Sequence, residues 1–218
     1  MNQTVIKSFK DILSPTVLGF ILKVGVISAL ITAGLIWFFG GLIKGFIASY
    51  LSWIPWEWAQ TTGASVAVIA AGYMLFVLTL SVVTSMMIEP LLIGLAKKHY
   101  PNHPVVGSPA LSASVLINLR SGLIFLVAFL LTFPLMFVPL VGAIWILWLW
   151  SIPLKSPSIY DVKSLFVAKE EKVKVPKATL LAMIAAAFNY IPILNVFAPV
   201  FAEIIFMHTI LGEKESRK

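Results

Sequence analysis

The sequence contains no cysteine and little charge, and each shortage excludes a class of protein. Without cysteine the chain forms neither disulfides nor cysteine-ligated metal centres. Only 11% of its 218 residues are charged, whereas a water-soluble domain carries about a quarter. No nucleophile elbow, zinc-peptidase motif or phosphate-binding glycine loop occurs. We therefore expect a protein that is not an enzyme and that carries no cofactor.

Apolar residues make up 60% of the chain and gather in four blocks that exceed the roughly 18 residues needed to suggest a membrane segment. Little sequence is left for a soluble domain, so residues 1–218 are interpreted as one membrane domain. The net charge of +7 lies in the segments between the blocks, where it suits anionic lipid headgroups. The expected partner of this charge is the lipid bilayer and not nucleic acid.

The first two blocks predict two long transmembrane helices, over residues 16–52 and 63–96. The loop between them carries Trp53, Trp56 and Trp58, which is typical of an interfacial aromatic belt. Lysines precede the first helix and follow the second. By the positive-inside rule, residues 1–15 are cytoplasmic and the tryptophan loop lies outside. The expected location is the inner (cytoplasmic) membrane.

The last two blocks, 121–154 and 178–212, are each roughly 35 residues long, too long for one span and too short for two. Both contain prolines near the middle, and basic residues flank both ends. Arms of about 15 residues reach roughly 22 Å of a 30 Å hydrocarbon core. We expect two partly penetrating helical hairpins and a cytoplasmic tail at 213–218. The alternative is a pair of single helices kinked at proline.

Two short motifs near the centres of these blocks are alike, Phe137–Gly142 (FVPLVG) and Tyr190–Pro199 (YIPILNVFAP). They resemble the CysZ sulfate-permease family, which includes the etoposide-induced membrane proteins. The resemblance implies an all-α fold of two transmembrane helices and two partly penetrating hairpins, homo-oligomers, and sulfate uptake for sulfur assimilation. One departure weakens the sulfate assignment. The family's Gly-Leu-Arg motif is missing at residues 15–20 (PTVLGF), and no arginine precedes Arg120.

Candidate anion ligands follow from the hairpin interpretation. A helix that begins in mid-bilayer presents free N–H groups and about half a positive charge. Such helices would begin near Gly142 and Asn195, and Asn189 flanks the second turn. Asn195 could instead only cap its helix. Lys23, inside the first helix, would replace the missing arginine, or its stem would carry the charge to the interface.

Three further charged residues are candidates for structural ion pairs. Glu89 would pair with Arg120, or lie among the headgroups, and Glu203 in the last arm would pair with Lys23 or Arg120. For Glu203 we favour a structural ion pair over a role in proton-coupled transport. His99 and His103 flank Pro101 in a loop with no carboxylate near them in sequence, so no metal site is expected.

Two functions remain open at this point. The first is an anion pathway, a sulfate permease or channel whose ligand is an inorganic oxyanion. The second is a non-transporting membrane scaffold of the same fold, which the missing arginine favours.

Overall fold

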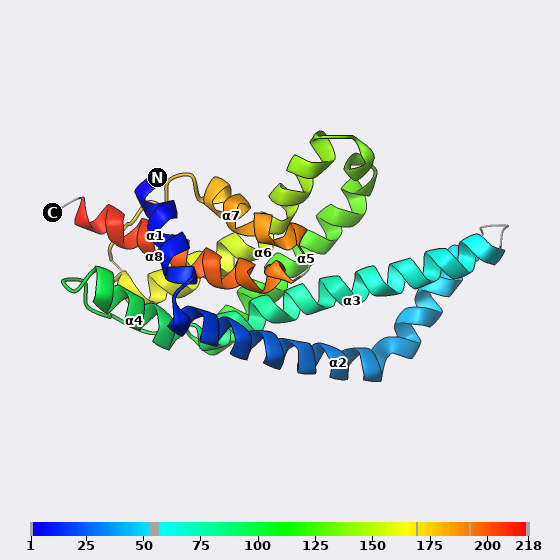
Figure 1. Ribbon diagram of the computed structural model, residues 1–218, viewed down its shortest axis with the longest axis horizontal. Helices are drawn as coiled ribbons and strands as arrows, with labels where there is room; N and C mark the ends of the chain where they lie inside the picture. Colours follow the sequence, from blue (N-terminus) through cyan, green and yellow to red (C-terminus); the bar gives the residue numbers. More distant parts are fainter. Residues whose placement is uncertain (1, 53–56, 169, 192, 217–218) are drawn as a thin grey trace.

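The computed structural model describes residues 2–52, 57–168, 170–191 and 193–216, and every regular element within those ranges is helical. The predicted all-α class is therefore confirmed. Trp53, Trp56 and Pro192 lie outside the described residues. In chain order the helices (Figure 1) are α1 (Asn2–Ile12), α2 (Pro15–Leu51), α3 (Glu57–Met87), α4 (Glu89–His99), α5 (Leu111–Thr132), α6 (Val141–Phe166), α7 (Ala178–Ala186) and α8 (Phe197–Glu215), with short 3₁₀ helices η1 (Phe133–Phe137), η2 (Ala187–Tyr190) and η3 (Leu194–Val196).

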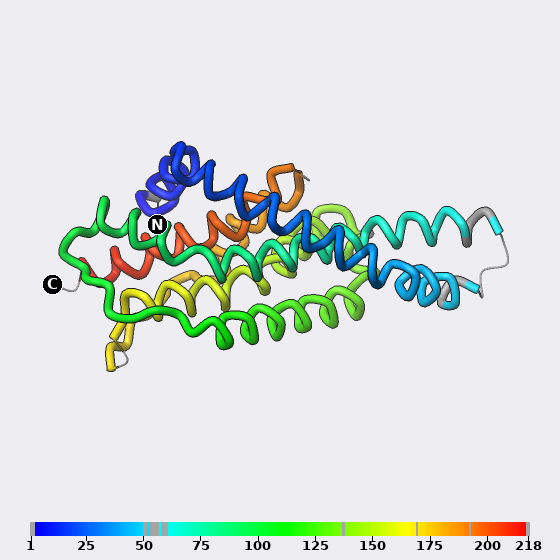
Figure 2. The backbone as a smooth tube through the Cα atoms, turned by 90° about the horizontal axis from the view of Figure 1, so that it is seen from below, coloured from blue at the N-terminus to red at the C-terminus, as the bar shows by residue number. Residues whose placement is uncertain are grey.

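The two longest helices, α2 and α3, run antiparallel and project together beyond the rest of the molecule (Figures 1 and 2). At 1.5 Å per residue, the 37 residues of α2 span about 55 Å. Its first half buries a single stripe at helical spacing, formed by Val17, Ile21, Val24, Ser28 and Thr32. Most of the remaining α2 side chains are exposed and apolar, which suits a helix facing lipid.

The second predicted helix, 63–96, is wrong as one continuous element. The structure ends α3 at Met87 and starts α4 at Glu89, with Ile88 between them. Pro90 explains the break, because it lacks an N–H donor and its ring would clash with the carbonyl one turn earlier in a continuous helix. Proline is tolerated in the first turn of a helix, which is where α4 places it.

Helices α5 and α6 pack against each other and form the first hairpin, turning through η1. Both continue past the predicted block 121–154 at their bases, so the 22 residues of α5 measure about 33 Å. The expected helical arms of about 15 residues are therefore wrong for this hairpin. Phe125 and Trp150 join the arms at a ring-centroid distance of 4.5 Å, and Trp145 donates to Thr132 at 2.8 Å.

The second hairpin is unequal, with a short outer arm and a buried inner one. Helix α7 has nine residues, whereas α8 has 19 and is surrounded by protein: every side chain from Ala198 to His208 is buried. Helices α1, α6 and α7 pack around α8. The two hairpin turns also touch, because the Tyr190 hydroxyl donates to the carbonyl of Ala143. Helix α8 thus forms the centre of the bundle.

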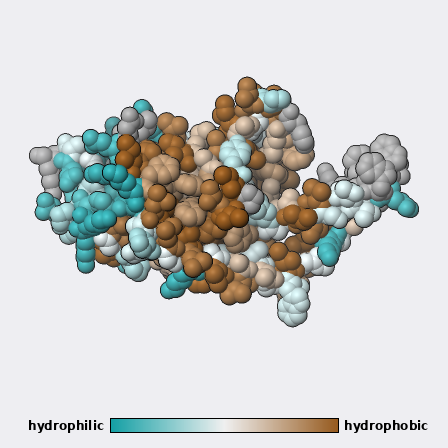
Figure 3. All heavy atoms as spheres, in the orientation of Figure 1, coloured by the Kyte–Doolittle hydropathy of each residue, from teal (hydrophilic) through white to brown (hydrophobic). Residues whose placement is uncertain are grey.

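Within the described residues, four helical stretches are long and apolar enough to cross a membrane, namely Pro15–Ser49, Thr61–Met87, Leu111–Met136 and Leu194–Glu215. Figure 3 shows apolar residues over the middle of the molecule and hydrophilic residues at the end that carries both termini. The chain is therefore a multi-pass membrane protein.

Candidate functional site

A pocket of about 720 Å³ lies where the two hairpin turns meet α3. Its walls are mainly apolar, and the side chains lining it are uncharged. The polar groups are few: the Tyr73 hydroxyl donates to the carbonyl of Asn189 at 2.9 Å, and the Asn189 side chain lies in the wall. The apolar wall is formed by Val66, Ile69, Ala70, Met74, Phe129, Met136, Ile146, Trp150 and Ala186.

The side chains of Asn189 and Asn195 are both buried, at 8% and 1% exposure. Within the described residues neither amide makes a hydrogen bond of standard geometry, although the side chain of Asn195 interacts with the Tyr73 hydroxyl. Burying such a group without a partner costs roughly 1–3 kcal/mol, and native proteins rarely accept that cost without a reason. Two such amides on one turn therefore indicate a site that accepts a hydrogen-bonding ligand.

Capping does not explain Asn195. The residue that precedes α8 is Val196, and no side chain caps that helix. The positive end of the α8 dipole lies beside Asn195. The backbone N–H of Phe197 already donates to the carbonyls of Asn195 and Leu194, and Pro199 has no N–H. Helix α2 approaches this turn closely, since a Cβ added at Gly25 would lie 3.0 Å from the Val196 side chain. The turn is therefore held against α2.

Gly142 has a structural role in the first turn. A Cβ on this residue would lie 2.4 Å from the carbonyl oxygen of Met136, so only glycine fits without a shift of the backbone. Its own N–H donates to the carbonyl of Val138 at 2.7 Å. The N–H of Gly142 is therefore not the free donor that the sequence predicted.

The predicted ion pairs are absent among the described residues. Lys23 is exposed and lines a separate groove of about 700 Å³ with Glu89 and Pro90, away from the hairpin pocket. Arg120 is exposed on α5, and it bridges neither Glu89 nor Glu203 within the described ranges. The exposure of Lys23 favours the interpretation in which its stem carries the charge to the interface.

Glu203 lies beside a second carboxyl group instead of a cation. It forms hydrogen bonds with Asp161 and Ser158 on α6, and its Oε2 has no hydrogen-bond partner in the part of the chain that the structure describes. Asp161 is fully buried and accepts hydrogen bonds from Ser85 on α3 and, at 2.7 Å, from Ser114 on α5. The ion-pair hypothesis for Glu203 is therefore wrong. Four helices meet at a buried carboxyl pair.

Asp161 was not among the predicted site residues, because it stands among lysines after an apolar block and resembles a solvated charge. A sequence pattern on the neighbouring helices does indicate a buried polar cluster. Ser81 and Ser85 on α3, and Ser114 and Asn118 on α5, repeat at four-residue spacing, which puts polar groups on one face of each apolar helix. Ser81 donates to Asn118 at 2.9 Å, so the two faces meet.

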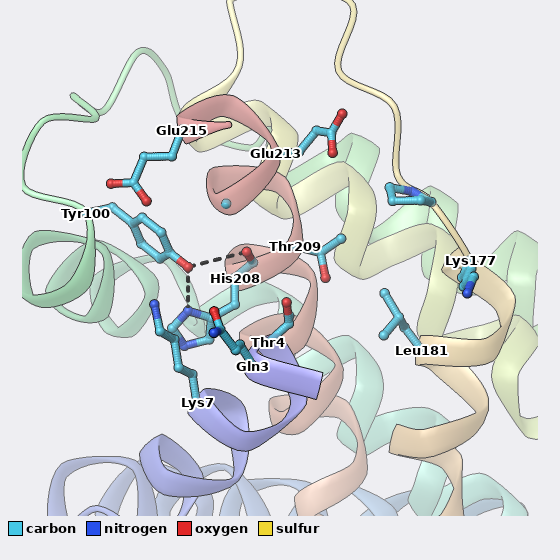
Figure 4. Close-up of a pocket in the computed structure, with 12 residues that line it drawn as sticks. Gln3, Thr4, Lys7, Tyr100, Lys177, Leu181, His208, Thr209, Glu213 and Glu215 are labelled. Atoms are coloured by element: carbon cyan, nitrogen blue, oxygen red, sulfur yellow. Dashed lines mark hydrogen bonds between the residues drawn. The ribbon is translucent and has the colours of Figure 1, made fainter. Parts of the chain in front are cut away.

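A second polar cluster lies near the end of the molecule that carries the termini (Figure 4). Asp11 of α1 contacts His99 of α4 through Oδ1 at 2.9 Å and His208 of α8 through Oδ2 at 2.8 Å. The Tyr100 hydroxyl lies 3.0 Å from Nδ1 of His208. We call Asp11, His99, Tyr100 and His208 the Asp11 cluster. No carboxylate lies near His99 in sequence, but Asp11 reaches it in the fold because α1 folds back onto α4 and α8.

Burial alters the acid–base behaviour of the Asp11 cluster. Burial alone would raise the pKa of Asp11, but the hydrogen bonds and charges of His99 and His208 outweigh it and hold that pKa below 3.8. Burial, with the nearby charges of Glu215 and Asp11, raises the pKa of Tyr100 to about 12. Beside the cluster lies a cavity of about 790 Å³ into which Lys7, Lys177 and Thr209 also face.

A model of one protein family, described as sulfate transporter CysZ/etoposide-induced protein 2.4, matches residues 4–199. The match spans both hairpin turns, and it confirms the resemblance drawn from the two proline motifs. No curated protein and no solved structure matches the chain.

Proposed function

Because the chain belongs to the sulfate transporter CysZ/etoposide-induced protein 2.4 family, we propose that it forms a pathway for sulfate or a related oxyanion across the membrane. The pathway is passive in this proposal, a channel or facilitator without a nucleotide-driven step. It feeds sulfur assimilation from the inner (cytoplasmic) membrane, with both termini cytoplasmic, and it works as a homo-oligomer.

The observation that carries the proposal is the pair of buried amides at the second hairpin turn. Within the described residues, no acceptor uses the two N–H donors of Asn189, and those of Asn195 face only the Tyr73 hydroxyl. The start of α8 adds a partial positive charge. An oxyanion at this turn would accept several hydrogen bonds without a formal positive charge beside it. Such a site binds weakly enough to release its ion, which a pathway requires.

The same chemistry accounts for the missing arginine motif. A fixed arginine forms bidentate bonds and an ion pair with an oxyanion, whereas an amide or a helix end forms hydrogen bonds in which only the anion carries a full charge. We therefore expect low affinity and modest discrimination among tetrahedral oxyanions. Lys23 and Gly142, both named as candidate ligands from the sequence, have no part in this site.

One observation favours the second candidate, a non-transporting membrane scaffold. The hairpin pocket is lined by uncharged and mostly apolar side chains, so it holds no side-chain cation to balance the charge of an anion. A scaffold would use the unsatisfied amides to bind a polar group of a partner or lipid. Transport measurements separate the two functions.

The test is uptake of radiolabelled sulfate into proteoliposomes, with protein-free vesicles as the blank. Asn189→Ala and Asn195→Ala should each reduce sulfate flux at least tenfold. Neither should lower the thermal stability of the purified protein, because each removes a buried polar group that makes no hydrogen bond of standard geometry within the described residues. A loss of flux without a loss of stability is the signature of a ligand-binding residue.

Asn118 provides the matched control. It is also buried, but it donates to the carbonyl of Ser114 at 3.0 Å and accepts from Ser81. Asn118→Ala should therefore destabilise the protein by about 1–3 kcal/mol. Normal flux through both turn variants would refute the assignment of the site. Absence of sulfate, phosphate and chloride flux through folded wild-type protein would favour the scaffold.

A further inference from the structure

Asp11, His99 and His208 come from α1, α4 and α8, which are distant in sequence, and their side chains converge on one point. The carboxylate of Asp11 directs one oxygen at Nε2 of His99 and the other at Nε2 of His208. The potential ligand atoms of the three residues all lie within 4.8 Å of one another. Two imidazole nitrogens and one carboxylate oxygen form a common ligand set for divalent transition metals.

The separations suit a small cation after a slight expansion. Zinc binds imidazole nitrogen and carboxylate oxygen at about 2.0–2.2 Å, which places tetrahedral ligand atoms about 3.3 Å apart. The observed contacts of 2.9 and 2.8 Å between Asp11 and the histidines need to open by about half an ångström, and any wider separation, up to 4.8 Å, needs to close toward the same value. Rotation of the partly exposed His99 side chain, at 22% exposure, supplies that movement without disturbing the core.

Tyr100 is a second, independent feature of a metal site. Metal-binding histidines usually hold their other ring nitrogen in a hydrogen bond, which fixes the orientation of the ring. The Tyr100 hydroxyl does this for His208, because it lies 3.0 Å from Nδ1 (Figure 4). The other ring nitrogen, Nε2, contacts Asp11. The His208 side chain is fully buried, so its ring is held in place on both sides.

Some charges near the Asp11 cluster oppose the binding of a cation and others favour it. Lys98 places Nζ 3.5 Å from Oδ1 of Asp11 and competes with a cation for that oxygen, but its side chain is 62% exposed and free to move away. Lys7 lies over the Tyr100 ring, 5.6 Å from its centre. Glu215 and Glu213 line the neighbouring cavity and bring negative charge to the same side.

We propose that Asp11, His99 and His208 form a binding site for one divalent transition metal ion of the zinc type. A bound ion would join α1, α4 and α8 and so stabilise the fold at this end of the molecule. The inference is independent of transport, because the cluster and the hairpin turn share no residue.

The test uses the full chain in detergent, stripped with a chelator and titrated with Co²⁺ and then Zn²⁺. We expect one Co²⁺ per chain, a visible absorption band of nitrogen and oxygen ligation, and its loss on addition of Zn²⁺. Both ions should raise the unfolding temperature, since they bind the folded state. The absence of cysteine removes thiolate competitors.

Three variants distinguish a metal site from a purely hydrogen-bonded cluster. Asp11→Asn and His99→Gln should weaken metal binding at least a hundredfold. His103→Gln changes a histidine outside the ligand set and should bind as the wild type does. His99→Gln is the safer of the two ligand variants, because His99 is the most exposed of the three ligands.

Lys98→Ala should change the metal affinity in the opposite direction, because removal of the competing ammonium group should tighten binding several-fold. If the cluster is only hydrogen-bonded, the titration would show no bound metal ion in the wild type or in any variant. That result would overturn the proposal, as would wild-type affinity in the folded Asp11→Asn and His99→Gln proteins.

Discussion

The steric role of Gly142 leads to a sharp prediction about the first hairpin turn. In Gly142→Ala the new methyl carbon would lie 2.4 Å from the carbonyl oxygen of Met136 and 2.8 Å from its carbonyl carbon. Ordinary contacts begin near 3.4 Å. The obstructing atoms belong to the backbone and cannot rotate away, so the turn must open by about 1 Å.

Forcing an extra carbon into a tightly packed site costs about 1–3 kcal/mol. For a chain of this length, each kcal/mol shifts the unfolding temperature by about 2–4 °C, so Gly142→Ala should melt several degrees lower. The assay is thermal unfolding of the purified protein in detergent, followed by tryptophan fluorescence, for which the chain has seven tryptophans.

Gly34→Ala is the control for this prediction. Gly34 lies within α2, and a Cβ there would meet nothing within 4 Å. Alanine is the better helix former, so the expected change is a gain of less than about 1 kcal/mol. Equal melting temperatures for Gly142→Ala and Gly34→Ala would refute the steric argument and the turn geometry behind it.

Two further predictions concern buried titratable groups. Glu203→Gln should keep the stability within about 1 kcal/mol, because glutamine preserves the shape and its amide can still donate a hydrogen bond to Asp161. Breaking a buried ion pair would instead cost about 3–5 kcal/mol in a chemical-unfolding assay. For Tyr100, the pKa of about 12 in the folded protein lies above the value of 10.0 in the unfolded chain. Its contribution to the free energy of unfolding is therefore complete below pH 10 and is lost as the pH rises toward 12. Wild-type stability should thus fall by about 2–3 kcal/mol more than that of Tyr100→Phe across this window, measured by unfolding at each pH; parallel curves would contradict the burial argument.

The apolar blocks and their prolines predicted most of the helical architecture. Block length and mid-block proline indicated both hairpins, because hydrophobic length and a missing donor act within a few residues of sequence. The break before Glu89 was also accessible, since Pro90 was visible. The error came from giving hydrophobic continuity more weight than a proline that cannot continue a helix.

The polar clusters could not be predicted from local sequence patterns in the same way. Asp11 and His208 are 197 residues apart, and no local pattern reports a contact made when α1 folds over α8. Glu203 and Asp161 meet for the same reason, although a search for cations alone led to the wrong partners. Asn189 and Asn195 were found because they flank a turn, which is a local feature. Their role as ligands stays a prediction, whereas the contacts made by helix packing were not predicted.

The two lysines of α2 bear on how the protein would fit membranes of different thickness. Lys23 and Lys44 are both exposed, and the stretch of α2 between them measures about 31 Å, close to the roughly 30 Å of a typical hydrocarbon layer. If each ammonium group stays in a headgroup region, bilayer thickness sets the tilt of α2. Gly25 lies just inside Lys23 and packs against the turn that holds Asn195, so a change in tilt would act directly on that turn. The acyl-chain length of the surrounding lipid would thereby affect the position of a turn at the centre of the protein.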